Sequence, residues 1–333
     1  MIGYLARTIG SKLGTVILTS MFVFALFGYG PQSPASVICN ANGRCTPQRE
    51  QLIEHSLGLD RPITTQYAEW VKGVFVGRTI SIGPGRHYTC GAPCLGVSYT
   101  TFQPVSQQLL KRFPATLSVA IGGSVFELFF GLLIAAIAAR NRGTVLDRSL
   151  VSGSLVVNSI PYYILALVAW LYLVNLWNVF PSTGYYPITH NPLRWFNGLL
   201  LPWLTLGLVG SATYGRYGRG AMVESLGEDY MRTAMAKGVR TNSRVFKHAM
   251  RAVLPPLTTI FGLDFASLLA GTFFTEYIFG INGIGLYTLQ SIKQLDYPII
   301  SAAVLISAVF IVIANFVVDL LYAVLDPRVR LLA

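Results

Sequence analysis

Long apolar runs with almost no charged residue alternate with polar segments along the 333-residue chain. Residues 13–29 and 302–325 are clear examples. Because the hydrocarbon core of a bilayer is ~30 Å thick, a helix needs about 20 apolar residues to cross it. The pattern predicts six spans, at residues 9–30, 115–139, 149–179, 198–215, 257–280 and 298–325. We therefore expect an all-α, polytopic integral membrane protein.

Composition and the placement of basic residues refine this expectation. Only 12% of the residues are charged and 53% are hydrophobic, whereas a soluble domain is about a quarter charged. Fifteen of the 25 Lys and Arg residues fall in the two termini and in the segments after the second and fourth spans, against two in the short loops on the other side. Since basic residues stay on the cytoplasmic side, both termini are expected in the cytoplasm. No small-residue cleavage site follows the first span, so residues 1–30 are expected to remain as a membrane anchor.

All four cysteines lie in the long extracytoplasmic loop region predicted at residues 31–112. They are Cys39, Cys45, Cys90 and Cys94. An even number of cysteines on the oxidising side of a membrane favours two disulfides. Zinc is the competing explanation, but the spacing lacks the usual short pairs with histidine partners. Three connectivities are open, and Cys39–Cys45 with Cys90–Cys94 is the simplest.

Two segments of the same loop region have helical spacing of apolar residues. Residues 47–57 place Leu52, Ile53 and Leu57 on one face, and residues 63–76 do the same with an aromatic pair, Tyr67 and Trp70. We expect two short amphipathic helices near the membrane surface, where they could also contact a partner protein.

Few polar features interrupt the spans. Pro161 lies inside the third span and predicts a kink, either for packing or as a gating hinge. Asp264 and Ser267 in the fifth span are candidates for a translocation path, because charges inside a membrane face a cavity or a partner. Glu276, near the outer end, is expected to line an outer gate or to cap the turn at Gly280.

The longest cytoplasmic segment, at about residues 216–254, is basic and reads as helical with a break near Gly238. Glycine there can take the left-handed conformation that ends a helix. The small side chains of Ala234 and Ala236 would let a partner approach closely. The pattern leaves two readings open: a short helix offered to a soluble partner, or a basic amphipathic helix on anionic lipid.

The sequence as a whole resembles permeases of ABC importers, in the dipeptide, oligopeptide and nickel branch. DYMRTAMAKG at 229–238 and HAMR at 248–251 are similar to the EAA loop of that branch. Further ordered similarities lie at residues 30–31, 57–67, 112–117, 159–161, 276–285, 296–298, 318–322 and 325–330. Two features depart from the family pattern: Met235 stands where a basic residue is common, and residues 83–98, with Cys90 and Cys94, look like an insertion.

This resemblance implies a type I importer permease fold, in which residues 113–333 form the transmembrane core and the chain forms half of a channel in the bacterial inner membrane. The resemblance implies that an ATPase subunit binds the helix before the glycine, through Tyr230, Arg232, Thr233, Ala234, Lys237 and Gly238. The implied partners are a second homologous permease, two ATPase subunits or one fused ATPase, and an extracytoplasmic solute-binding protein. ATP and Mg would be held by the ATPase subunits, so this chain is expected to carry no cofactor or metal and no catalytic residue.

Rival functions remain to be weighed. An ATPase-independent secondary transporter would bring inverted repeats and paired ionisable residues within the membrane, and a membrane enzyme would bring a cluster of catalytic groups. The four histidines lie in separate loops, and the sequence contains no Gly-x4-Gly-Lys-Ser/Thr phosphate loop. The transported solute is expected to be a di- or oligopeptide, with nickel chelates, glutathione or oligosaccharides as alternatives.

Overall fold

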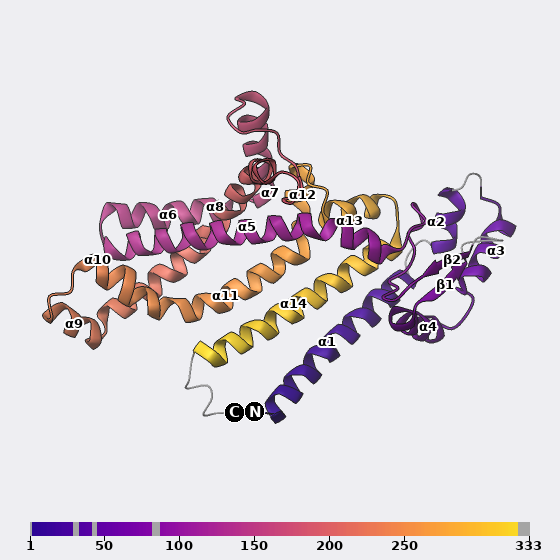
Figure 1. Cartoon of the computed structure of the whole chain (residues 1–333), viewed down its shortest axis with the longest axis horizontal. Coiled ribbons are helices and arrows are strands. Elements are labelled where there is room, and N and C mark those ends of the chain that lie inside the picture. The colour runs from indigo at the N-terminus through magenta and orange to yellow at the C-terminus, as the bar shows by residue number, and fades with distance from the viewer. Residues whose placement is uncertain (1, 29–32, 42–44, 82–86, 326–333) are drawn as a thin grey trace. The chain divides into compact units, whose positions relative to one another are not determined.

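A computed structural model describes residues 2–28, 33–41, 45–81 and 87–325. It divides into two compact units: residues 1–114 with 283–312, and residues 115–282 with 313–333. Figure 1 labels the elements of both units. The family-like segments at 30–31 and 326–330 lie outside the described residues, as do the side chains from 319 onward.

The first unit combines one long N-terminal helix with a small disulfide-bearing module. Its elements are α1 (Ile2–Gly28), α2 (Pro34–Ala41), α3 (Pro47–Leu57), α4 (Ile63–Val76), β1 (Arg78–Ser81), β2 (His87–Cys90), α13 (Ile284–Lys293) and the first turns of α5 (Val105–Arg140) and α14 (Tyr297–Leu325). The helices predicted at 47–57 and 63–76 are confirmed as α3 and α4. Thr46 caps α3 by accepting a hydrogen bond from the Arg49 amide, and Gly58 ends it with φ 71°.

The aromatic face predicted for α4 packs on α1. The Tyr67 hydroxyl lies 2.7 Å from the Ser20 hydroxyl, and the Phe24 ring contacts the rings of Tyr67 and Trp70. The prediction for α3 was only partly right, because Ile53 is buried whereas Leu52 is 57% exposed.

The expectation of a purely helical chain was wrong in this module. Strands β1 and β2 form an antiparallel hairpin in which Arg78 pairs with Cys90 and Ser81 with His87. Each strand has only four residues, too few to show a clear period of two in the sequence. Disulfides join Cys39 to Cys45 and Cys90 to Cys94. They form part of a core with Ile38, Ile53 and Val97.

The second unit is a bundle of long helices. It contains the rest of α5 and α14 together with α6 (Val145–Ser159), α7 (Tyr162–Ala169), a π-helix at Trp170–Leu176, α8 (Pro192–Gly227), α9 (Asp229–Ala236), α10 (Thr241–Ser243), a second π-helix at Arg244–Ala249, α11 (Met250–Gly271) and α12 (Phe273–Ile278). Helix α8 is central, because α6 and α11 both pack along it. Helix α5 also approaches α8 closely, and a Cβ added at Gly215 would lie 2.8 Å from Ile134.

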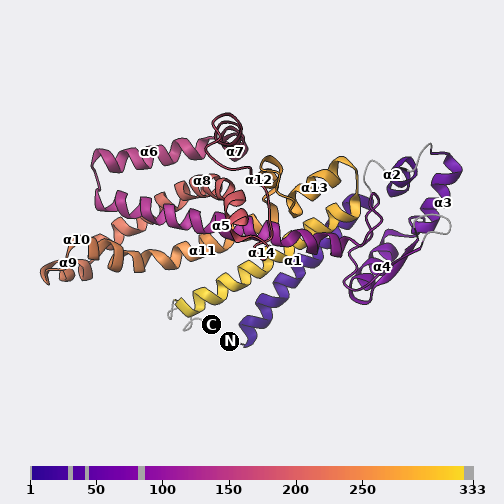
Figure 2. The same ribbon diagram turned by 45° about the horizontal axis from the view of Figure 1, so that its top comes forward.

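Among the described residues, four helices are long and apolar enough to cross a membrane, and a bent pair brings the number to five. The bent pair is the predicted third span: α6 and α7 meet at Ile160–Pro161 at an angle of 94°, and Figure 2 shows α7 turning away from the line of α6. The predicted kink is therefore a sharp break. The predicted first span corresponds to a shorter apolar stretch, Gly10–Leu26 of α1.

Two predicted boundaries differ from the structure. The span predicted at 198–215 continues without a break to Gly227 in α8. The span predicted at 257–280 instead starts upstream and ends at Gly271, and Thr272 separates it from the short helix α12. As a result, Glu276 lies on the short helix α12 and not on the predicted span.

Candidate functional site

Helix α9 contains most of the residues predicted to contact an ATPase. Apart from Met231 and the half-buried Ala234, its side chains are exposed. The Tyr230 hydroxyl lies 2.5 Å from the Ser225 hydroxyl at the end of α8. Arg232 and Asp229 form an exposed ion pair at 3.3 Å. The helix therefore presents nearly its whole circumference to solvent.

One buried apolar side chain anchors this exposed helix in the core of the bundle. Met231 is 1% exposed and enters a hydrophobic core that joins four other elements. That core comprises Ala135, Ala136 and Ala139 of α5, Tyr214 and Met222 of α8, Val245 and Ala249 of the second π-helix, and Val253 and Leu257 of α11. Met231 therefore joins α9 to these four elements in one core.

The end of α9 is sharply defined by backbone hydrogen bonds. The Gly238 amide donates to the Met235 carbonyl at 2.9 Å, and the Val239 amide donates to the Ala234 carbonyl at 3.1 Å. This pair of bonds is a Schellman motif, which requires a left-handed residue between them. Gly238 has φ 77°, so the predicted left-handed end of the helix is confirmed. Lys237 is exposed beside it.

The basic segment after the predicted break at Gly238 is also helical, from Thr241 through the second π-helix into α11. Its Val245 and Ala249 are buried in the core that holds Met231. A π-helical turn is rare and often marks a functional position. Helix α9 is therefore held from both sides, by the end of α8 and by the start of the α11 segment.

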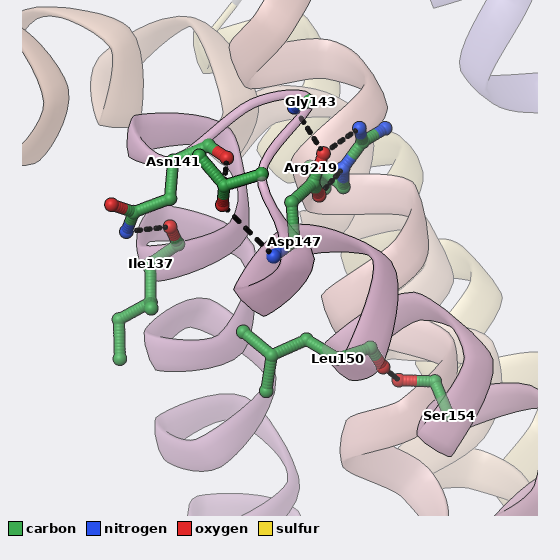
Figure 3. A network of polar contacts seen from close by, with 8 residues as sticks. Ile137, Asn141, Gly143, Asp147, Leu150, Ser154 and Arg219 are labelled. Atoms are coloured by element: carbon green, nitrogen blue, oxygen red, sulfur yellow. Dashed lines mark hydrogen bonds and ion pairs between the residues drawn. The ribbon is translucent and has the colours of Figure 1, made fainter.

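An ion pair that the sequence did not predict lies in the same half of the unit (Figure 3). Asp147 near the start of α6 accepts two hydrogen bonds from Arg219 of α8, Nε to Oδ1 at 2.5 Å and Nη2 to Oδ2 at 2.6 Å. The Gly143 amide also donates to Oδ2 at 2.9 Å. The Asp147 side chain is 3% exposed. The one sequence signal is Thr144 three residues before Asp147, a spacing typical of a helix start, and the structure confirms Thr144 as the N-cap.

The predicted path residues of α11 lie in different surroundings. The Tyr214 hydroxyl of α8 donates to Asp264 Oδ2 at 2.8 Å, whereas Ser267 is exposed and bonds to the Leu263 carbonyl of its own helix. Glu127 of α5, also ionisable, is 6% exposed and packs against Gly210 of α8. The structure thus pairs Asp264 with Tyr214 and does not bring it into a hydrogen bond with Ser267.

Glu276 forms the centre of a fully buried cluster. Its Oε1 accepts hydrogen bonds from the hydroxyls of Thr116 on α5 and Thr272, both at 2.7 Å, and its side chain is 0% exposed. Its carbonyl accepts from the Ile281 amide at 2.8 Å, which caps the turn at Gly280. One residue away, the Thr275 hydroxyl lies 2.9 Å from that of Tyr162, the first residue of α7 after Pro161.

Among the described residues, no group of three or more His, Cys, Asp or Glu side chains is arranged to hold a metal ion. The candidate site is instead a surface suited to a partner protein. Helix α9 is exposed, has a defined end, and inserts one buried apolar side chain, Met231, into a bundle of membrane-length helices. This arrangement fits a membrane subunit that is moved by a soluble partner.

The membrane-length helices and the exposed helix α9 are typical of a transport permease. Comparisons with known proteins identify the family. The chain belongs to the family of binding-protein-dependent transport system inner membrane components, whose model matches residues 131–331. The model for the N-terminal part of such membrane components matches residues 1–120. The chain is therefore a polytopic permease subunit of an ABC transport system, and such systems also include ATPase and solute-binding subunits.

Relatives of known annotation match over nearly their whole length. The di/tripeptide transport system permease protein DppB of Pseudomonas aeruginosa is 34% identical, over 99% of both chains. The probable peptide ABC transporter permease protein y4tP of Sinorhizobium fredii is 33% identical, over 98% of this chain and 99% of its own. The dipeptide permease DppB of Escherichia coli is 30% identical, over 99% of both chains.

A solved structure supports the fold. The inward-facing MetNI methionine ABC transporter contains a chain that superposes with a TM-score of 0.54, covering 66% of this chain and 97% of that one, at 17% identity. The likeness extends to the fold of a type I importer permease.

Proposed function

We propose that this chain forms half of the channel of an ATP-driven peptide importer and that α9 is the helix through which a cytoplasmic ATPase moves it. The observation that carries the proposal is the geometry of α9: exposed side chains around a single buried anchor, Met231. A helix on lipid would bury an apolar face of its own, whereas the apolar side chain of α9 that is buried points into the bundle.

Peptides are the proposed substrate. Three relatives that match almost the whole chain are named as di/tripeptide, dipeptide or peptide permeases. This chain is expected to provide the conduit, while an extracytoplasmic binding protein selects the solute.

The complex proposed for this chain contains a second homologous permease, two ATPase subunits or one fused ATPase, and the binding protein. ATP and Mg are bound by the ATPase subunits in this proposal. Tyr230, Arg232, Thr233, Ala234, Lys237 and Gly238 are the proposed contact residues. All six lie on α9 or at its C-terminal end.

The proposed topology has six spans with both termini in the cytoplasm. Residues 31–112 then form the extracytoplasmic loop region, where the disulfides Cys39–Cys45 and Cys90–Cys94 lie on the oxidising side. The core is residues 113–333. Counting the bent pair and the apolar stretch of α1, the described residues offer six candidate segments.

Asp264, Ser267, Glu276 and Pro161 remain the proposed path and gate residues. Asp264 is held by Tyr214, and Glu276 is buried, so Glu276 would line a gate only in another conformation of the importer. Pro161 marks the break at which such a change of conformation could begin. Alternating access requires that conformation to exist.

The test is purification of the complex from native membranes in mild detergent, with the subunits identified by mass. The variant Ala234→Glu places a charge on α9, and Asn242→Glu places the same charge on an exposed position just after it. We expect a second permease and ATPase subunits with the wild type and with Asn242→Glu, and loss of the ATPase alone with Ala234→Glu. A wild-type chain that purifies alone would indicate an ATPase-independent transporter.

A further inference from the structure

Helix α6 is fastened to α8 by a buried fork of hydrogen bonds. Both carboxylate oxygens of Asp147 are engaged by Arg219, and the Gly143 amide adds a third donor, as Figure 3 shows. A bidentate contact between a guanidinium and a carboxylate fixes orientation as well as distance. Because Asp147 is almost fully buried, sliding α6 along α8 would leave a charge unpaired, which is costly.

The Arg219 end of this contact is continuous with α9. Arg219 lies in the last turns of α8, which runs unbroken to Gly227 before α9 begins at Asp229. The same part of α8 contributes Met222 to the core that holds Met231. Arg219 is therefore joined to α9 through one helix and one shared core.

The other end of α6 leads to the Glu276 cluster. After the 94° break at Pro161, the Tyr162 hydroxyl contacts Thr275 of α12 at 2.9 Å, and the Tyr163 ring lies 5.5 Å from the Phe274 ring. Glu276 follows directly and bonds to Thr116 of α5. The bent segment α6–α7 thus contacts the α9 end of the unit through Asp147 and the Glu276 cluster through Tyr162.

We propose that Asp147 and Arg219 are a positioning pair that makes α6 move together with α8, so that α6–α7 transmits the displacement of α9 to the Glu276 cluster. The inference rests on the proposed coupling role of α9. Physical contact alone does not establish such transmission. A pair that served only packing would change the amount of folded complex and nothing else.

The first experiment measures peptide transported per ATP hydrolysed by the reconstituted complete transporter. The variants are Asp147→Asn, Arg219→Gln, their double variant and Arg219→Lys, with Arg148→Gln as an exposed control one residue from Asp147. We expect each single neutral variant to lower the ratio about fivefold or more. The double variant should be no worse than the worse single variant, because the two residues act as a unit. Arg219→Lys keeps the charge but loses the bidentate hydrogen bonds, so its ratio of peptide transported to ATP hydrolysed should lie between those of the neutral variants and the wild type.

The second experiment follows the far end of α6–α7. All four native cysteines are in disulfides, so Ile164→Cys, at a 43% exposed position of α7, adds the one free thiol of this chain. Its labelling rate by a maleimide should change when ATP is added to the complex. Arg219→Gln should abolish that change, and so should Tyr162→Phe, which removes a single hydroxyl; Arg148→Gln should preserve it.

The outcomes separate the two proposals. If the ATPase co-purifies with the variants and both the transport ratio and the labelling response match the wild type, the positioning role is wrong and the proposed function stands. If the ratio is unchanged per folded complex while the yield falls, the pair is structural only. If the wild-type chain never binds an ATPase, the proposed function fails and this inference fails with it.

Discussion

The disulfide-bearing module and helix α9 are attached to their units in opposite ways. In the first unit, Asp296 is 0% exposed and accepts hydrogen bonds from the Ser98 hydroxyl at 2.5 Å, the Thr100 hydroxyl at 2.8 Å and the amides of Tyr99 and Thr100. Two disulfides add covalent links within the module itself. In the second unit, α9 is held by the side chain of Met231 and by its ends.

The difference indicates that the disulfide-bearing module is rigidly attached and that α9 can be displaced more easily. A buried carboxylate with several donors has one favourable geometry, whereas one methionine in an apolar core can shift with little loss. A rigid module suits a surface against which a binding protein docks, and a lightly held helix suits a part that a partner pushes. The predictions below test this contrast.

The largest effect is expected at the rigid attachment. Asp296→Ala removes the acceptor of four hydrogen bonds and leaves their donors buried, so the free energy of unfolding should fall by about 3 kcal/mol. The thermal midpoint of the purified complex and the proteolysis of residues 45–105 would measure this. Asp60→Ala, which removes an exposed carboxylate bonded to His55, should change neither, and equal behaviour of the two variants would contradict the rigid attachment.

A smaller but local effect is expected at the anchor of α9. Met231→Ala leaves a cavity in the core and should cost about 2 kcal/mol or more. Hydrogen exchange of residues 229–239 should accelerate, and the ATPase should be lost from the complex. Met235→Ala, on the same helix but 55% exposed, is the control; if it had the same effect on exchange, Met231 would not be the anchor.

The end of α9 should be less sensitive. Gly238→Ala forces a side chain into the left-handed conformation and should cost about 1 kcal/mol, with faster exchange confined to the last turn of α9. Gly220→Ala, inside α8 with open space around it and no positive φ, should be neutral or slightly stabilising. Unchanged exchange at 234–239 in Gly238→Ala would show that the Schellman motif does not define this end.

The smallest effect on stability is expected for Arg232→Ala. The Arg232 side chain is 74% exposed and that of its ion-pair partner Asp229 is 95% exposed. Ion pairs as exposed as this one contribute little to the free energy of unfolding. The thermal midpoint should therefore not move, while the affinity for the ATPase should fall if Arg232 contacts it. A fall in stability without a change in affinity would assign Arg232 to the fold instead.

Local features of the sequence predicted local structure well. The bounds of α3 and α4 follow from apolar spacing with Thr46, Gly58 and Gly77 at their ends, and the break after α9 follows from Gly238. These signals lie within a few residues of what they determine. The cysteine pairing is different, because the sequence left three connectivities open and the structure has the simplest of them.

Features that depend on distant residues could not be read in the same way. Arg216 and Arg219 marked the end of the predicted span, but α8 runs on to Gly227. Arg219 is paired there with Asp147, 72 residues away in the sequence. Glu276 was placed in an apolar span, whereas its hydroxyl partners include Thr116 from another helix. The hairpin at Arg78–Cys90 depends on pairing that its short strands do not signal individually.

The central claim, that α9 is the helix on which an ATPase acts, has a direct test. Ala236→Cys, at an exposed position of α9, can carry a maleimide–benzophenone cross-linker, with Gln48→Cys on exposed α3 as the control. We expect illumination of the complete transporter to join the Ala236→Cys chain, and not the Gln48→Cys chain, to an ATPase subunit identified by mass. Cross-links from Ala236→Cys to lipid alone, or to no ATPase in an active complex, would contradict it.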